Sequence, residues 1–215
     1  MSKVTVFGAG AWGSTMAQVL SDAGNDVLLW GRSSDVINEI NTSHTNAKYL
    51  GTHTLPDSLA ATTDLKEAFD FSDIYVLAIP AQQLRTTLGE WKQFFKPTST
   101  IVSTLKGIEI STQLRMTEVI IEILGPHKVA MITGPNLADE LVLRQPAGAV
   151  AADAPCVSGS SRRLSPIRAP SPRPSAGVLR RSSRRSHRPW CSGGKMPEIR
   201  RLDTATPDFG AQLHA

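Results

Sequence analysis

The chain has 215 residues and a formal net charge of +4, with 23 Lys and Arg against 19 Asp and Glu. Such a length is that of one domain or one and a half. The charge is uneven, because residues 1–150 carry 11 basic and 15 acidic side chains whereas residues 151–215 carry 12 and 4. The excess of positive charge therefore belongs to the second part of the chain, and the first part is mildly acidic.

Composition also excludes several classes of protein. No segment approaches the roughly 20 apolar residues of a membrane helix, and the first apolar run stops at Gly8, too early for a signal peptide. The only cysteines, Cys156 and Cys191, are far apart, a spacing typical of neither a disulfide scaffold nor a zinc site. We therefore expect a cytoplasmic protein with no membrane anchor and no metal site.

Short apolar runs alternate with stretches of helical periodicity through the first 152 residues. A buried parallel strand is a continuous apolar run, and a surface helix repeats its apolar residues every three or four positions. By these criteria we expect strands at 4–7, 26–30, 73–79, 100–104, 128–132 and 147–152, and helices at 12–23, 33–41, 82–95, 111–124 and 136–144. The alternation predicts an α/β fold that is doubly wound, with a mostly parallel sheet.

Three glycines follow the first expected strand, in the sequence GAGAWG at 8–13. The pattern G-x-G-x-x-G between a strand and a helix is typical of a Rossmann domain that binds a dinucleotide. Gly8 would permit the tight turn, Gly10 would let the backbone approach a pyrophosphate, and Gly13 would let the helix pack against the strand. The alternative is a turn that only joins the strand to the helix. We favour a dinucleotide-binding Rossmann domain over 1–152.

The residues after the second expected strand indicate which dinucleotide binds. NAD-binding proteins usually place Asp or Glu there to bind the ribose hydroxyls, whereas an arginine accommodates the 2′-phosphate of NADP. Here the sequence is Gly31-Arg32-Ser33. Arg32 therefore favours NADP, or tolerance of NADP and NAD, and the alternative is an arginine that simply lies in solvent.

Pro80, Lys106 and Gly134 directly follow expected strands. Open α/β sheets bind ligands outside the carboxyl ends of their strands, so we expect these residues to converge on one site. A lysine at such a site can stabilise the negative charge that develops on a carbonyl oxygen during its reduction. The alternatives are a solvated surface lysine and an ordinary turn at Gly134-Pro135.

Six segments resemble, in the same order and at about the same spacing, the bacterial NAD(P)-dependent glycerol-3-phosphate dehydrogenases. They are GAGAWG (8–13), LLWGR (28–32), NAKYL (46–50), IPAQ (79–82), STLKGIE (103–109) and TGPNLADEL (133–141). The pair LKGIE and GPNLADE is the most specific, and it argues against the wider β-hydroxyacid dehydrogenase group. The resemblance covers about 3–152, which in that family is the dinucleotide domain alone. It implies reduction of dihydroxyacetone phosphate by NAD(P)H, or the reverse reaction, in glycerophospholipid synthesis.

The same resemblance implies roles for individual residues. Cofactor contacts are implied for the glycine turn and for Ala11, Trp12, Arg32 and Ala138. Lys106 would be the catalytic lysine of this domain and would contact both the substrate and the cofactor. Gly134 and Asn136 would lie beside the phosphate or the hydroxyls of the substrate, although the family often has Ser or Thr at the position of Asn136.

Residues 153–215 show neither the pattern of the family nor any helical or strand periodicity. In the family a helical second domain follows, with a lysine given the proton-transfer role and an Arg-Asn motif near the substrate phosphate, and neither has a counterpart here. The abundance of Arg, Ser and Pro predicts a largely disordered tail and is typical of a GC-rich gene translated in a shifted frame. The alternative is an arm that binds nucleic acid through RRSSRRSHR (180–188). We favour the frameshift.

Loss of a second domain would affect catalysis more than cofactor binding. The glycine turn needs only the first domain, so we expect weak dinucleotide binding with little or no turnover, since loss of a proton donor alone costs roughly 10²–10⁴-fold in rate. An uncovered domain surface would expose apolar side chains and favour self-association. The alternative functions are a non-catalytic dinucleotide-binding fragment and a broken-gene product. The expected partner is a small-molecule substrate rather than nucleic acid or a membrane.

Overall fold

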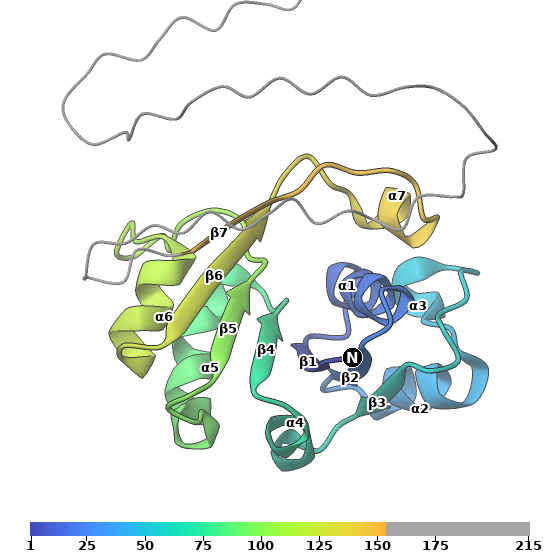
Figure 1. Cartoon of the computed structure of the whole chain (residues 1–215), viewed down its shortest axis with the longest axis horizontal. Coiled ribbons are helices and arrows are strands. Elements are labelled where there is room, and N and C mark those ends of the chain that lie inside the picture. Colours follow the sequence, from blue (N-terminus) through green and yellow to red (C-terminus); the bar gives the residue numbers. More distant parts are fainter. Residues whose placement is uncertain (154–215) are drawn as a thin grey trace, which may run out of the picture. The chain divides into compact units, whose positions relative to one another are not determined.

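The computed structural model describes residues 1–153, which form one seven-stranded sheet with its helices packed against it (Figure 1). The strands are β1 (Lys3–Phe7), β2 (Asp26–Trp30), β3 (Ala60–Thr62), β4 (Ile74–Leu77), β5 (Thr100–Ser103), β6 (Lys128–Thr133) and β7 (Val150–Asp153). The α-helices are α1 (Ala11–Asp22), α2 (Ser34–Ser43), α3 (Ala47–Leu50), α4 (Leu65–Phe71), α5 (Leu84–Trp91), α6 (Met116–Leu124) and α7 (Ala138–Val142). The predicted disordered tail lies, from residue 154 onward, outside the described residues.

The strand order β3-β2-β1-β4-β5-β6-β7 confirms the predicted doubly wound sheet. Neighbouring strands are parallel throughout, except that β7 runs antiparallel to β6. The chain proceeds outward from β1 through β2 to β3 and then returns to the other side of β1 with β4. The carboxyl ends of β1 and β4 therefore form the point where the winding reverses, which is where open α/β sheets bind ligands.

The two faces of the sheet bury separate apolar cores, because successive strand residues point to opposite faces. In β1, Val6 belongs to the core that includes Ala17 of α1 and Ile37 of α2. Phe7 belongs to the other core, with Leu88 of α5 and further residues of α4 and α6. Aromatic rings fill much of this second core; Phe7 lies 4.7 Å from Phe69 and 5.1 Å from Trp91 between ring centroids. Within residues 1–153, no helix is long and apolar enough to cross a membrane.

Three short elements were not predicted, namely α3, β3 and α4. Each has too few residues for its periodicity to stand out, and β3 has only three. The start of α4 is nevertheless marked in the sequence, since the Asp64 carboxylate accepts hydrogen bonds from the N–H groups of Lys66 and Glu67 at 2.8 and 3.2 Å. An N-cap of this kind satisfies donors that the first helical turn leaves free.

The prediction of a helix over 111–124 was wrong in its first turn, because α6 begins at Met116. The Glu118 carboxylate accepts a hydrogen bond from the Arg115 N–H at 2.9 Å, which starts the helix there. Gln113, just before it, has a positive φ of 59°. The helix predicted at 82–95 is also shorter, and 3-10 turns at Ala81–Gln83 and Lys92–Phe94 flank α5. Likewise, α7 covers only the middle of 136–144.

Replacing Gly13 by Ala is expected to destabilise the domain. A Cβ at this position would lie 1.7 Å from the carbonyl oxygen of Gly8, so the backbone itself would have to move. We expect the free energy of unfolding, from urea denaturation, to fall by roughly 1–3 kcal/mol or more, as for other overpacked sites. The matched control is Gly89→Ala in α5, where a Cβ meets nothing within 4 Å. This control is expected to stabilise the helix by roughly 0.4–1 kcal/mol, and equal effects at Gly13 and Gly89 would contradict the packing argument.

Candidate functional site

The turn after β1 is packed so closely that two of its glycines have no room for a side chain. Gly8 has a φ of +121°, and a Cβ there would lie 2.5 Å from the carbonyl oxygen of Ala78 at the end of β4. Gly13 is equally crowded, because a Cβ there would collide with the carbonyl oxygen of Gly8. Gly10 differs, because a Cβ there would meet nothing within 4 Å. The turn is thus fixed by its outer glycines, and at Gly10 its backbone borders open space that a bound group can enter.

The same turn begins α1 without a side-chain cap. Ser14 N–H donates to the Gly10 carbonyl at 3.0 Å, which is the first bond of the helix. The N–H groups of Ala11, Trp12 and Gly13 precede that bond, the N-cap residue makes no side-chain hydrogen bond, and the first turn has no acidic residue. Free N–H groups and the positive end of the helix dipole together attract an anion, so this turn suits a phosphate group.

A cavity of about 1000 Å³ opens beside the turn, at the carboxyl ends of the strands. Its size is at the upper end for a small-molecule site. It brings together most of the residues singled out in the sequence, namely Gly8, Gly10, Ala11, Trp12, Arg32, Lys106, Asn136 and Ala138. Gly13 and Gly134 do not line it. Gly13 packs against the Gly8 carbonyl, and a Cβ on Gly134 would meet the Gly148 carbonyl at 2.5 Å.

The end of the cavity next to β2 carries a cation. Arg32 is exposed and lines the cavity beside Ser33. Among the described lining residues the one carboxylate is Glu90, which comes from α5 rather than from the end of β2. The end of β2 thus presents a cation and no described lining carboxylate of its own, so it suits a negatively charged group of a ligand.

Lys106 lies on the opposite side of the turn, between the ends of β5 and β6. Its Nζ donates to the Asn136 backbone carbonyl at 3.2 Å, to Asn136 Oδ1 at 3.3 Å and, at 3.5 Å, to the Gly134 carbonyl. The same Nζ is 5.4 Å from the centroid of the Trp12 ring. Asn136 is buried, at 4% exposure. The ammonium group is thus held at the cavity wall by neutral oxygens, and its charge is not neutralised by any described carboxylate.

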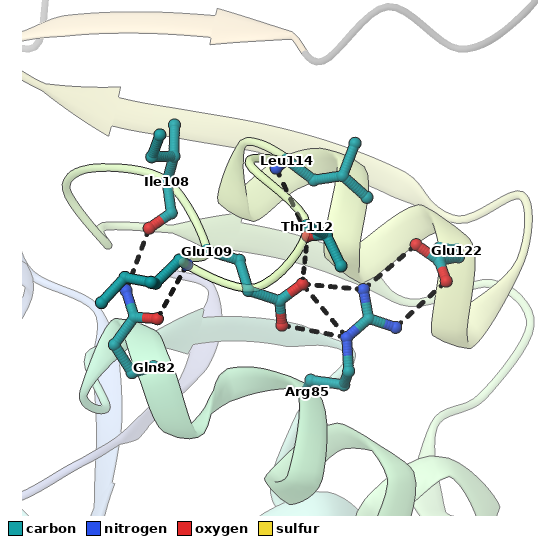
Figure 2. Close-up of polar contacts among 8 residues, drawn as sticks. Gln82, Arg85, Ile108, Glu109, Thr112, Leu114 and Glu122 are labelled. Carbon is teal, nitrogen blue, oxygen red and sulfur yellow. Dashed lines mark hydrogen bonds and ion pairs between the residues drawn. The ribbon is translucent and has the colours of Figure 1, made fainter.

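The loop that carries Lys106 is fastened to α5 by a network that the sequence did not reveal (Figure 2). Arg85 donates to both oxygens of Glu109, at 2.9 Å from Nε and 2.9 Å from Nη2, and also to both oxygens of Glu122, at 3.0 and 3.1 Å. Gln82 accepts from the Ile110 N–H at 3.0 Å and donates to the Ile108 carbonyl at 2.9 Å. Arg85 therefore binds the Glu109 side chain, and Gln82 binds the backbone on both sides of Glu109.

Charge in this network stabilises the ionised carboxylates. The Arg85 hydrogen bonds, followed by that from the Thr112 hydroxyl, hold the pKa of Glu109 below its ordinary value. Arg85 likewise lowers the pKa of Glu122, and the two carboxylates together raise the pKa of Arg85. Such pairs are strong because the planar guanidinium matches a carboxylate with two parallel bonds.

The residues that hold the Lys106 loop and the glycine turn stand in segments that the sequence analysis singled out, but their contacts could not be assigned from the sequence. Gln82 ends IPAQ, Glu109 ends STLKGIE, and Asn46, buried beside the glycine turn, begins NAKYL. Each segment was singled out by resemblance, yet no spacing in the sequence shows that these side chains bind distant backbone. Tyr49 and Glu90 line the cavity and were also missed.

Comparison with known proteins agrees with this geometry. Residues 3–156 match the family model described as the NAD-dependent glycerol-3-phosphate dehydrogenase N-terminus. The chain belongs to this family. Among curated members, a glycerol-3-phosphate dehydrogenase [NAD(P)+] of Thermobifida fusca is 48% identical over 155 residues, covering 71% of this chain and 46% of that protein. One from Corynebacterium diphtheriae is 50% identical over 152 residues, covering 70% and 46%.

Solved structures of glycerol-3-phosphate dehydrogenases have the same fold. The enzyme from Coxiella burnetii superposes with a TM-score of 0.66 at 28% identity, covering 71% of this chain and 46% of that one. The enzyme from Saccharomyces cerevisiae also gives a TM-score of 0.66, at 30% identity, covering 75% and 50%. The chain thus spans about half the length of the glycerol-3-phosphate dehydrogenases that it matches, and this half is their N-terminal one.

Replacing Glu109 by Gln is expected to make this domain of the glycerol-3-phosphate dehydrogenase family less sensitive to acid. Since the folded pKa of Glu109 lies below the ordinary value of about 4.3, the ionised carboxylate stabilises the fold above that pH. This contribution is lost as the pH falls through the lowered pKa. In urea denaturation at neutral and acidic pH, the wild type should therefore lose more unfolding free energy on acidification than E109Q.

The matched control for E109Q is Glu140→Gln, which removes an exposed carboxylate of α7 that makes no described side-chain hydrogen bond. It should follow the wild type at each pH. An E109Q profile that runs parallel to the wild-type profile would show that the ion pair with Arg85 does not contribute to the acid dependence.

Proposed function

We propose that the described domain binds NADP(H) or NAD(H). In this proposal the chain supplies the cofactor half of a cytoplasmic sn-glycerol-3-phosphate dehydrogenase, which reduces dihydroxyacetone phosphate to provide the precursor of glycerophospholipids. The observation that carries the proposal is the turn at 8–13, where the outer glycines leave no room for a Cβ and Gly10 borders open space. Family membership supports the same function, because its model is that of an NAD-dependent dehydrogenase.

The turn would hold the pyrophosphate through the N–H groups of Gly10, Ala11 and Trp12. Arg32, exposed at the cavity wall, would bind the adenosine side of the cofactor, where a 2′-phosphate distinguishes NADP from NAD. Ala138 lines the cavity near Asn136 and would lie near the cofactor. When bound, the cofactor supplies the hydride that reduces a carbonyl carbon.

Lys106 would be the catalytic residue of this half. Its ammonium group is held by the carbonyls of Gly134 and Asn136, so it is already oriented before a substrate enters. A cation fixed beside a reacting carbonyl stabilises the developing alkoxide more than the neutral ground state. Asn136, which lines the cavity, would position the substrate hydroxyls or phosphate next to it, whereas Gly134, which does not line it, would act through its carbonyl contact with Lys106.

The substrate end of the cavity has little positive charge among the described residues. Among the described lining residues Lys106 is the one cation there, since Arg32 lies at the end of β2. The substrate phosphate and the developing alkoxide would then compete for a single ammonium group. We therefore expect this chain to bind the cofactor but to turn over dihydroxyacetone phosphate slowly.

The test is a titration of the purified chain with NADPH and with NADH, followed by quenching of tryptophan fluorescence. Trp12, Trp30 and Trp91 all line the cavity, so binding should quench the emission. We expect NADPH to bind more tightly than NADH. Arg32→Ala should weaken NADPH binding by roughly tenfold or more, the effect of losing a hydrogen bond to a charged group, and should change NADH binding little.

Lys66→Ala, which removes an exposed cation of α4, is the control for the change in net charge. The same samples are then assayed with dihydroxyacetone phosphate. Binding with little turnover is the expected result. Absence of binding to both cofactors would refute the proposed function, and rapid turnover would refute the expectation that the charge of Lys106 is insufficient.

Exposed apolar side chains near the cavity support a second expectation, that copies of the chain self-associate. Ile108 and Ile110, in the loop after β5, are 50% and 78% exposed, and Leu137, after β6, is 61% exposed. Exposed apolar side chains near a ligand site are typical of contact surfaces. Sedimentation velocity should show association that I110K weakens while Lys66→Ala does not; a monomeric wild type would contradict this expectation.

A further inference from the structure

Asn46 is a buried polar residue that none of the roles above uses. It is 0% exposed, and its Nδ2 donates to the carbonyl oxygen of Ala9 at 3.1 Å and to Ser14 Oγ at 2.8 Å. Both acceptors lie in the glycine turn or the first turn of α1, 37 and 32 residues earlier in the chain. Burial of an amide costs free energy unless its hydrogen bonds are made. Because a buried amide is costly, we infer that Asn46 has a specific function at the glycine turn.

The side chain acts here as a donor. Ala9 offers a carbonyl, which can only accept, so the amide nitrogen of Asn46 must face it. Asn46 Oδ1 is buried and accepts no hydrogen bond from the described residues. The contact with Ala9 is therefore the one that fixes the orientation of the Asn46 amide.

The position of the Ala9 carbonyl decides where the next N–H points. In a trans peptide the C=O of Ala9 and the N–H of Gly10 point in opposite directions. Since the carbonyl is held toward Asn46, the Gly10 N–H points away from it, and this N–H makes no described hydrogen bond. Gly8 and Gly10 flank Ala9, and glycine restricts backbone rotation least. Without a restraint the Ala9–Gly10 peptide can turn over and direct an oxygen toward a bound anion.

We propose that Asn46 is a positioning residue for the pyrophosphate: by holding the Ala9 carbonyl it keeps the Gly10 N–H directed into the cavity. This inference rests on the proposed dinucleotide binding and names the residue that prepares the turn for it. An oriented donor binds an anion more tightly than one that must first be ordered.

Asn46 is itself held firmly. Its backbone carbonyl accepts from the N–H groups of Tyr49 and Leu50 at 3.1 and 2.8 Å, at the start of α3. Glu39 of α2 accepts from the Ala47 N–H at 2.7 Å and from the Thr45 hydroxyl at 2.8 Å, and these bonds lower the pKa of Glu39. The residues on both sides of Asn46 are thus bound to α2, and these contacts hold the backbone that carries the Asn46 amide in place.

The test compares Asn46→Leu, which keeps the approximate shape without the donor, with Asn46→Ala. Ser14→Ala is the matched control, because it removes the second acceptor and leaves the contact with Ala9. The probes are NADPH, followed by tryptophan quenching, and ADP and adenosine, each measured as a competitor of NADPH. ADP carries the diphosphate that the turn would bind, and adenosine does not. Urea denaturation reports the stability of each variant.

We expect N46L and N46A to bind NADPH and ADP roughly tenfold to hundredfold more weakly, as for loss of a hydrogen bond to a charged group, with adenosine nearly unchanged. Ser14→Ala should bind all three as the wild type does. Wild-type affinity in N46L and N46A would overturn the inference but not the proposed function. Equal losses for ADP and adenosine, or failure of both variants to fold, would make Asn46 purely structural and overturn it too. A wild type that binds no dinucleotide would overturn both.

Discussion

The close approach of Gly13 to Gly8 is the constraint on which the rest of this domain depends. At this point α1 packs against the end of β1 with no space for a Cβ, and β1 is the strand from which the sheet extends in both directions. Contact between backbones there places the start of α1 directly over the carboxyl end of the sheet. The uncapped N–H groups of that helix consequently face the cavity instead of solvent.

Parallel strands bring the remaining groups of the site to the same edge. The chain crosses from one side of β1 to the other between β3 and β4, so Arg32 follows β2 on one side of the turn and Lys106 follows β5 on the other. Their positions at opposite ends of one cavity follow from the strand order alone. The proposed division between a phosphate-binding turn and a reacting end therefore has a simple origin in the topology of the sheet.

Two kinds of support hold these groups, and they differ physically. The loop of Lys106 is held by Arg85 and Glu109 through charged, partly accessible contacts, which salt and acid weaken. The glycine turn is held by the neutral, buried amide of Asn46, which neither salt nor pH affects directly. The uncharged support lies beside the proposed anion site. A cation or carboxylate at that position would add its own electric field to that of the helix terminus.

The sequence by itself determined the alternation of strands and helices, the glycine turn and the family, because these depend on local periodicity and on the steric requirements of single residues such as Gly8. It also indicated which segments matter, including NAKYL and STLKGIE. Only the tertiary structure decided which groups Asn46 and Glu109 contact, that α6 begins at Met116, and that β7 runs antiparallel. The reason is that those features depend on contacts between residues far apart in the chain, such as Asn46 with Ala9 and Arg85 with Glu109, which leave no regular spacing in the sequence.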